Sequence, residues 1–190
     1  MISITRLYCD PEMSFPGDAL RYATNLDPKY THHAARPVVV WNCTRRCNLR
    51  CAHCYAAGDG TAAPYELSTA KARSMIDDLA AFNVPVLLFS GGEPLLRDDV
   101  FECMSHAAEK GLRVALSTNG TPITPDIAEQ ISDVPVAYVG VSLDAASSET
   151  NDAFRGKAGA FEKALAGIRN VRSAGIKTGI RFTMPRRNIG

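Results

Sequence analysis

The stretch of sequence from residue 38 to residue 55 reads VVVWNCTRRCNLRCAHCY. Its first four residues form a continuous apolar run, which is typical of a strand in a parallel sheet. The run leads into a loop with cysteines at positions 47, 51 and 54, separated by three and then two residues. Three thiolates are one too few to close a tetrahedral structural zinc site, but they suit a four-iron cluster that keeps one iron free of protein ligands. The stretch therefore predicts a strand that ends in a cluster-binding loop.

Other interpretations of this loop stay open. The cysteines can form a zinc knuckle that Cys43 or His53 completes, or they can be three unrelated thiols. Outside a zinc site, Cys43 is expected to be a small buried residue and His53 a packing residue. Iron and sulfide content distinguishes the cluster from zinc.

Four further apolar runs show the same pattern, in which the run ends directly in polar residues or glycines. They span residues 84–89, 112–116, 136–141 and 177–184. The first three end in Ser90-Gly91-Gly92-Glu93-Pro94, Ser117-Thr118-Asn119-Gly120 and Ser142-Leu143-Asp144. Because the loops at the carboxyl ends of parallel strands carry the functional site, these polar ends are expected to meet at one edge of a sheet.

Helical signals separate the apolar runs. They are the cap Ser68, the stop Gly111, the start Thr124-Pro125 and the stop Gly175. Alternating helices and fully apolar strands predict an α/β fold with a parallel sheet covered on its outer face by helices. Repeated crossovers in one direction curl such a sheet into a barrel or partial barrel, and an open doubly wound sheet is the alternative.

Composition and charge exclude several classes of protein. The chain has 190 residues, of which 46% are hydrophobic and 22% charged, as in an ordinary globular domain. A net charge of +1 gives no global field for nucleic acid or an anionic membrane, and no apolar run is long enough to span a bilayer. The amino terminus lacks the pattern of a secretory signal, and the cysteine usage favours a reducing cytoplasm.

The cysteine loop together with Gly91-Gly92-Glu93-Pro94 resembles the radical S-adenosylmethionine (SAM) superfamily. Residues 1–9, 17–22, 37–55, 87–96, 116–121 and 140–144 extend the likeness to its tetrapyrrole-modifying branch. The resemblance implies a partial (β/α) barrel with about five of six strand-helix units. It divides the chain into a leader segment, residues 1–36, and a core domain, residues 37–190, that is incomplete at its carboxyl terminus.

The resemblance also implies a set of site residues. Cys47, Cys51 and Cys54 would hold a [4Fe-4S] cluster, and the amino and carboxylate groups of SAM would chelate its fourth iron. The residues implied in SAM binding are Gly91, Gly92 and Glu93 for the amino group, Ser142 and Arg155 for the carboxylate, Ser117 and Asn119 for the ribose or the substrate, and Tyr55 for the adenine. The alternatives are plain turns, helix caps at Ser142 and Asp144, and a solvated Arg155.

The function that the resemblance implies is reductive cleavage of SAM to a 5′-deoxyadenosyl radical, which modifies side chains of a siroheme-derived tetrapyrrole. One enzyme of this branch removes acetate side chains from 12,18-didecarboxysiroheme, and another acts in haem d1 biosynthesis. The expected partners are the small-molecule tetrapyrrole and a reductant such as ferredoxin or flavodoxin, with no nucleic acid or membrane. The alternatives are a peptide-maturation enzyme of the same superfamily and a non-catalytic iron–sulfur fragment.

Overall fold

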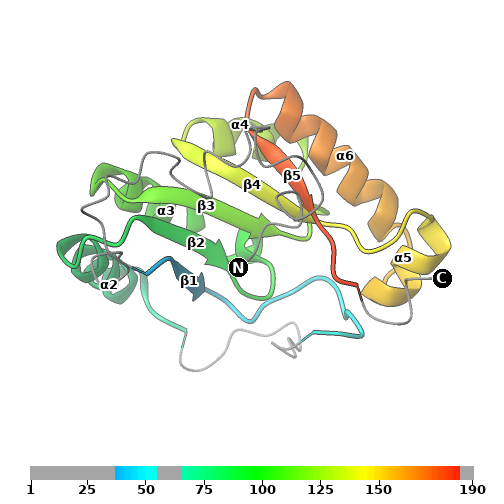
Figure 1. Cartoon of the computed structure of the whole chain (residues 1–190), viewed down its shortest axis with the longest axis horizontal. Helices are drawn as coiled ribbons and strands as arrows, with labels where there is room; N and C mark the ends of the chain where they lie inside the picture. The colour runs from blue at the N-terminus through cyan, green and yellow to red at the C-terminus, as the bar shows by residue number, and fades with distance from the viewer. Residues whose placement is uncertain (1–36, 55–65, 185–190) are drawn as a thin grey trace, which may run out of the picture. The chain divides into compact units, whose positions relative to one another are not determined.

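The computed structural model describes residues 37–54 and 66–184 (Figure 1). These residues contain a five-stranded parallel sheet. Its strands are β1 (Val39–Asn42), β2 (Val86–Ser90), β3 (Arg113–Thr118), β4 (Val136–Ser142) and β5 (Thr178–Arg181). The predictions for the leader segment 1–36 and for Tyr55 lie outside the described residues.

The strands follow one another in the sheet in the order β1-β2-β3-β4-β5. An open doubly wound sheet reverses direction at a switch point, whereas here each crossover moves to the next neighbour on the same side. The sequential order therefore decides between the two architectures that periodicity left open. It confirms the α/β fold with a partial (β/α) barrel.

Helices alternate with the strands along the chain (Figure 1). They are α2 (Thr69–Ala81), the 3-10 helix η2 (Pro94–Leu96), α3 (Val100–Glu109), α4 (Pro125–Ser132), α5 (Ser148–Arg155) and α6 (Ala160–Ser173). The predicted starts are confirmed, because the side chain of Ser68 accepts a hydrogen bond from the Lys71 N–H and that of Thr124 accepts one from the Ile127 N–H.

The hydrophobic core lies on one face of the sheet. The strand residues in it alternate along each strand and are all fully buried: Leu87, Phe89, Val114, Leu116, Val139 and Val141. They pack against α2, α3, α4 and α6, whose apolar faces cover this side. The other face is more open, and Val40 on it is 54% exposed. In the part of the chain that the structure describes, helices cover one face of the sheet, and the opposite face is the concave one.

The structure adds one helix that sequence periodicity does not predict, α5 between β4 and α6. Its sequence, SETNDAFR, has only two apolar residues, so it carries no apolar stripe that would reveal it. Local signals define its ends instead. Ser147 caps the amino end, and Gly156 ends the helix in the left-handed conformation at φ 66°.

Two predicted strands are longer in the sequence than in the structure. The second begins at Val86 instead of residue 84, because Pro85 has no N–H to donate to the sheet. The fifth ends at Arg181 instead of residue 184, because the Thr183 N–H donates to the Asp144 carboxylate. The continuing chain thus leaves the ladder and turns toward the end of β4.

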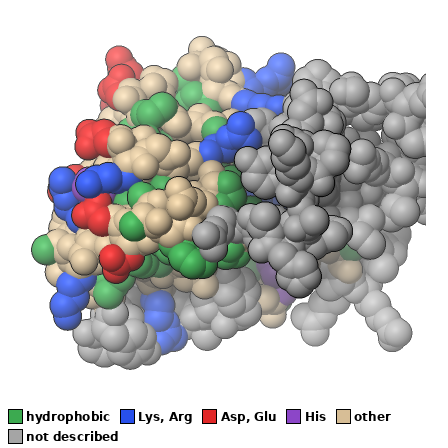
Figure 2. Space-filling model, turned by 60° about the vertical axis from the view of Figure 1, so that its left-hand side comes forward, with side chains coloured by type: hydrophobic (Ala, Val, Ile, Leu, Met, Phe, Trp, Pro, Cys, Tyr) green, Lys and Arg blue, Asp and Glu red, His purple; other side chains and the backbone are tan. Residues whose placement is uncertain are grey.

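The surface carries charges of both signs. Figure 2 shows lysine and arginine side chains interspersed with acidic ones on the side of the molecule that lies on the left in Figure 1. This mixture fits the net charge of +1. Among the described residues, no helix has the length and apolar character to cross a membrane.

A matched pair of phenylalanine substitutions tests the one-sided core. Phe89 is fully buried and Phe82 is 51% exposed. We expect Phe89→Ala to lower the free energy of unfolding by about 3–5 kcal/mol and Phe82→Ala to lower it much less, because only the first leaves a cavity. Urea unfolding of both variants measures the difference. Equal losses would contradict this placement of the core.

Candidate functional site

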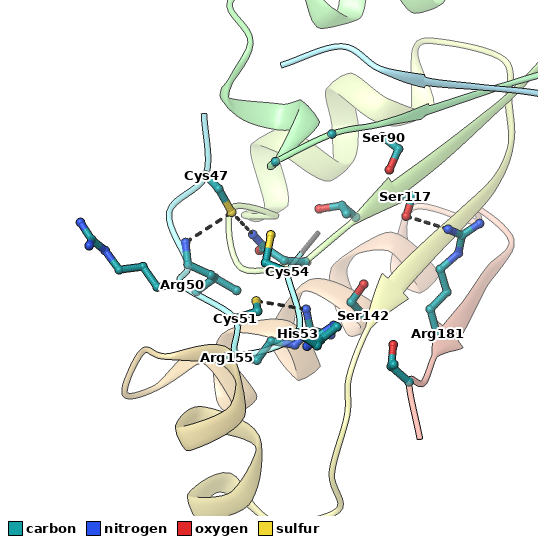
Figure 3. A pocket seen from close by; sticks show the side chains of 16 residues that line it. Cys47, Arg50, Cys51, His53, Cys54, Ser90, Ser117, Ser142, Arg155 and Arg181 are labelled. Atoms are coloured by element: carbon teal, nitrogen blue, oxygen red, sulfur yellow. Dashed lines mark hydrogen bonds between the residues drawn. The ribbon is translucent and has the colours of Figure 1, made fainter. Parts of the chain in front are cut away.

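A cavity of about 870 Å³ opens where the strands reach their carboxyl ends (Figure 3). Most of the residues that the sequence predicts for the site line it: Cys47, Cys51, Cys54, Gly91, Gly92, Ser117, Asn119, Ser142 and Arg155. The three cysteines lie on one side of it, on the loop after β1. Polar side chains from separate strand ends therefore converge here, as the sequence predicts.

The cysteine loop packs directly against the turn after β2. The Gly92 N–H donates to the Thr44 carbonyl and the Glu93 N–H donates to the Arg46 carbonyl, both at 2.7 Å. A Cβ atom added to Gly91 or Gly92 would overlap backbone atoms of this loop. Gly91 also has a φ of 144°, which L side chains rarely adopt. The two glycines are therefore required for the close approach of two backbones.

The other side of the cysteine loop pairs with the end of α5. The Arg50 N–H donates to the Arg155 carbonyl at 3.1 Å, and the Ala52 N–H donates to the Phe154 carbonyl at 2.9 Å. Gly156 follows without a side chain, and a Cβ there would overlap the Arg50 carbonyl oxygen. The helix that sequence analysis missed thus helps to hold the three cysteines in place.

Glu93 lies beneath the cavity and does not line it. Its side chain is fully buried and accepts hydrogen bonds from the Thr118 hydroxyl at 2.7 Å, the Asn119 N–H at 2.7 Å and the Leu95 N–H at 3.2 Å. Burial raises the pKa of the carboxyl to about 7, although these hydrogen bonds favour its charged form. Through these hydrogen bonds, Glu93 links the turn after β2 to the end of β3.

Asn119 links the end of β3 to the cysteine loop. Its amide nitrogen donates to the Asn48 side-chain oxygen at 2.8 Å and lies 4.0 Å from the Cys47 sulfur. Its side-chain oxygen accepts from the Thr121 hydroxyl at 2.6 Å. Thr121 in turn accepts from the Asn48 amide at 2.8 Å. This closed ring of polar contacts fixes the side chain of Asn119 at the edge of the cavity.

Arg155 is buried at the wall of the cavity and is not a solvated surface charge. Its guanidinium forms an ion pair with the fully buried Asp144 and donates a hydrogen bond to the Cys51 sulfur at 3.5 Å. Asp144 also accepts from the Thr183 N–H at 2.8 Å. The alternative that Ser142 or Asp144 caps the next helix is wrong, because Ser147 caps it.

His53 stacks on Phe154, with ring centroids 4.5 Å apart and planes 12° from parallel. Partial burial lowers the pKa of the imidazole, which Asp144 at 3.9 Å opposes. Cys43 is 2% exposed, and burial raises the pKa of its thiol to about 12. These contacts agree with a packing role for His53 and a buried thiol at Cys43.

Arg97 is a structural residue that sequence analysis did not identify. Its buried guanidinium donates to the Cys43 carbonyl at 2.9 Å and the Leu67 carbonyl at 2.8 Å, and it pairs with Asp99 at 2.6 Å. It also lies 5.2 Å from the centre of the Trp41 ring. Arg97 thereby fixes the start of the cysteine loop. It follows the apolar pair 95–96 in a segment without periodicity, so no sequence signal marks it.

The donor set of the cavity, three thiols on one loop, fits an iron–sulfur cluster that keeps one iron free of protein ligands. Within residues 37–54 and 66–184, no group of three His, Cys, Asp or Glu side chains is already arranged around one point. Cluster cysteines bind different iron atoms and need no such convergence. The cysteine side chains face an open cavity, where a cluster has room for a further ligand.

Comparison with known proteins identifies the family of this chain. The pattern of the family described as "Radical SAM superfamily" matches residues 41–189. The chain belongs to the radical SAM superfamily. Radical SAM proteins bind a [4Fe-4S] cluster and SAM, in agreement with the cofactors predicted from the cysteine loop.

Two curated radical SAM relatives are named for tetrapyrrole products, which confirms the predicted branch. The chain is 48% identical to the Fe-coproporphyrin III synthase of Methanosarcina barkeri, over 100% of this chain and 48% of that protein. It is 47% identical to the pre-heme d1 synthase of Dinoroseobacter shibae, over 85% of this chain and 40% of that protein. The chain thus spans less than half the length of these two relatives.

A solved structure shows the same fold. The radical SAM protein anSMEcpe with bound AdoMet (SAM) superposes with a TM-score of 0.63 at 22% identity, over 75% of this chain and 42% of that one. At this level of identity the likeness concerns the fold alone. It agrees with the partial barrel seen here.

We expect Gly92→Ala to displace the cysteine loop, because the added methyl group meets the carbonyl oxygens of Arg45 and Arg46. Iron content after anaerobic reconstitution and the free energy of unfolding should both fall. Gly111→Ala is the control: nothing lies within 4 Å of its Cβ, and its positive φ costs about 1 kcal/mol of stability without affecting iron. Full iron content in Gly92→Ala would contradict the close approach.

The pKa of Glu93 predicts a pH dependence of stability. The ordinary value is 4.5 and the folded value about 7, so the native state binds more protons between these values. The contribution of protonated Glu93 to the free energy of unfolding is therefore fully present below about pH 4.5. It is lost as the pH rises to about 7, and the loss amounts to up to about 3 kcal/mol.

Urea unfolding between pH 5 and pH 8 measures this effect as the difference between the wild type and Glu93→Gln, which cannot titrate. The exposed Glu109→Gln should follow the wild type. Parallel profiles for the wild type and Glu93→Gln would show that Glu93 titrates normally.

Proposed function

We propose that this chain is the SAM-binding core of an enzyme that modifies side chains of a siroheme-derived tetrapyrrole by radical chemistry. The observation that carries the proposal is the opening of the cysteine loop onto a large cavity at the carboxyl edge of a radical SAM fold. The names of the curated relatives support the tetrapyrrole. Removal of acetate side chains from 12,18-didecarboxysiroheme is the specific reaction that we propose.

We assign Cys47, Cys51 and Cys54 as the cluster ligands. When bound, the cluster and SAM supply the one-electron chemistry that cleaves the sulfonium of SAM. The chain holds the loop rigidly through backbone hydrogen bonds to the β2 turn on one side and to α5 on the other. An external reductant such as ferredoxin or flavodoxin is required, and the reduced thiols suit a cytoplasmic protein.

We assign SAM to the part of the cavity formed by the strand ends. Gly91 and Gly92 line the cavity with backbone atoms, and Ser117, Asn119 and Ser142 offer polar side chains. Glu93 has its carboxylate hydrogen-bonded beneath the cavity, so we propose that it positions the β2 turn and Asn119 for SAM. Arg155 acts from the wall beside Cys51, where its charge faces both the cysteine loop and the cavity.

The charges that line the cavity support an acidic substrate. Three arginines line it, Arg50, Arg155 and Arg181, of which Arg155 is paired with Asp144, whereas none of the described lining residues is an aspartate or a glutamate. Tetrapyrroles of the siroheme series carry several carboxylate side chains. An electropositive wall attracts such a polyanion, and guanidinium groups bind carboxylates with paired hydrogen bonds.

Substitution of the loop cysteines tests the cluster ligands. We expect Cys47→Ala, Cys51→Ala and Cys54→Ala each to abolish cluster binding, measured as iron and sulfide per chain and as the visible absorption of the cluster. Cys103→Ala is the matched control, because Cys103 is buried in the core away from the cavity. Normal iron content in any of the three loop variants would refute its assignment.

Production of 5′-deoxyadenosine tests the reaction and its substrate. Anaerobically reconstituted protein is incubated with dithionite and SAM, with and without 12,18-didecarboxysiroheme. We expect production that increases with the porphyrinoid, together with loss of its acetate groups by mass spectrometry. Production of 5′-deoxyadenosine that does not respond to the porphyrinoid would support radical SAM chemistry but refute the porphyrinoid as the substrate. A cognate peptide that stimulates production instead would establish the peptide-maturation alternative.

A further inference from the structure

Arg181 takes an unusual path across the concave face of the sheet. It is the last residue of β5, yet its guanidinium donates a hydrogen bond to the Ser117 hydroxyl at the end of β3, at 2.8 Å. The strand between them is β4. The Arg181 side chain therefore crosses a whole strand to reach the floor of the cavity (Figure 3).

Two glycines make this crossing possible. Gly140 of β4 and Gly179 of β5 are paired in register. A Cβ on Gly140 would overlap Nε of Arg181, and a Cβ on Gly179 would overlap the hydroxyl of Tyr138. The Arg181 stem thus fills the space above one glycine, while the Tyr138 ring fills the space above the other. This packing limits the positions that the guanidinium can take, so little freedom remains to be lost when a ligand binds.

Arg181 and the buried Arg155 occupy different parts of the cavity wall. Arg155 forms its ion pair with Asp144 and contacts Cys51, so its charge is balanced beside the cysteine loop. Arg181 lies across the cavity from the three cysteines (Figure 3), where its guanidinium donates a hydrogen bond to the Ser117 hydroxyl. A guanidinium has five N–H donors in a planar fork that matches a carboxylate.

We propose that Arg181, positioned by Ser117 and by the Gly140 gap, is a carboxylate-binding residue in this cavity. The carboxylate belongs to a side chain of the acidic substrate or to the methionine part of SAM. The first source rests on the proposed function, and the second requires only SAM binding. In either case the residue determines where an anionic ligand is anchored relative to the cysteine loop.

Equilibrium binding to the reconstituted chain tests this assignment with two probes. The first is SAM, and the second is iron-coproporphyrin III, compared with its methyl-esterified form. The variants are Arg181→Gln, which removes the charge, Arg181→Lys, which keeps it without the fork, and Gly140→Ala, which keeps the arginine and displaces it. Arg169→Gln on the exposed side of α6 is the control for a simple change in net charge.

We expect Arg181→Gln and Gly140→Ala to raise the Kd of one probe about ten-fold or more, Arg181→Lys to raise it less, and Arg169→Gln to leave it unchanged. Weaker binding of the porphyrin acid, with equal binding of its ester to wild type and variant, identifies a substrate carboxylate. Weaker binding of SAM alone identifies the SAM carboxylate.

Unchanged affinity of Arg181→Gln for both probes would overturn the proposal. If wild-type protein binds SAM but not the porphyrin, the substrate in the proposed function is wrong, and the affinity for SAM alone tests Arg181. Weaker SAM binding by Arg181→Gln then supports the proposal, and unchanged SAM binding overturns it. Circular dichroism of each variant checks that it is folded. Urea unfolding of Arg181→Gln and Arg181→Lys should match the wild type, which separates a binding defect from misfolding.

Discussion

The close contact between the cysteine loop and the Gly91-Gly92 turn is the constraint on which the rest of the site depends. Backbone donors of the turn bind carbonyl groups of the loop at 2.7 Å, and neither glycine can gain a side chain without overlap. Backbone atoms rather than flexible side chains therefore set the distance between loop and turn. The end of α5 holds the loop from its other side in the same way. The three cysteines are thus positioned by the chain itself, which lowers the entropy that ordering a ligand loop would otherwise cost.

The one-sided core explains why a cavity forms next to this loop. Large apolar side chains point toward the helices, and the opposite face carries small or polar residues such as Ser90, Ser117, Gly140 and Ser142 near the strand ends. The parallel register brings these residues to one edge, since each strand ends near its neighbours. The same register aligns Gly140 with Gly179, so that larger side chains from adjacent positions can lie over them. The packed core on one face of the sheet and the cavity on the other both follow from the alternation of large apolar and small or polar residues along the strands.

The sequence predicts the parts of this site that depend on local patterns. The apolar runs reveal the strands, and the polar residues that end them, such as Ser117 and Ser142, fall at the cavity because parallel strands share an edge. It does not predict α5, whose short polar sequence has no apolar stripe, or Arg97, which binds the carbonyl groups of Cys43 and Leu67, 54 and 30 residues away in the chain. The crossing of Arg181 over Gly140 is likewise a tertiary contact between two strands. Such residues become recognisable only when the register of the sheet is known.

The two sides of the cavity differ in their charged groups. Under the proposed function, the thiolates of the cysteine loop would bring negative charge to the loop side, where Arg155 is already paired with Asp144. They would offset the positive charge of Arg50 on the same loop, so a polycarboxylate would be attracted less strongly to that side. Arg181 offers positive charge on the opposite side, beside Ser117 and away from the cysteines. Under the proposed function, a tetrapyrrole with several carboxylates would anchor one of them at Arg181 while the acetate side chain that reacts lies nearer the cysteine loop.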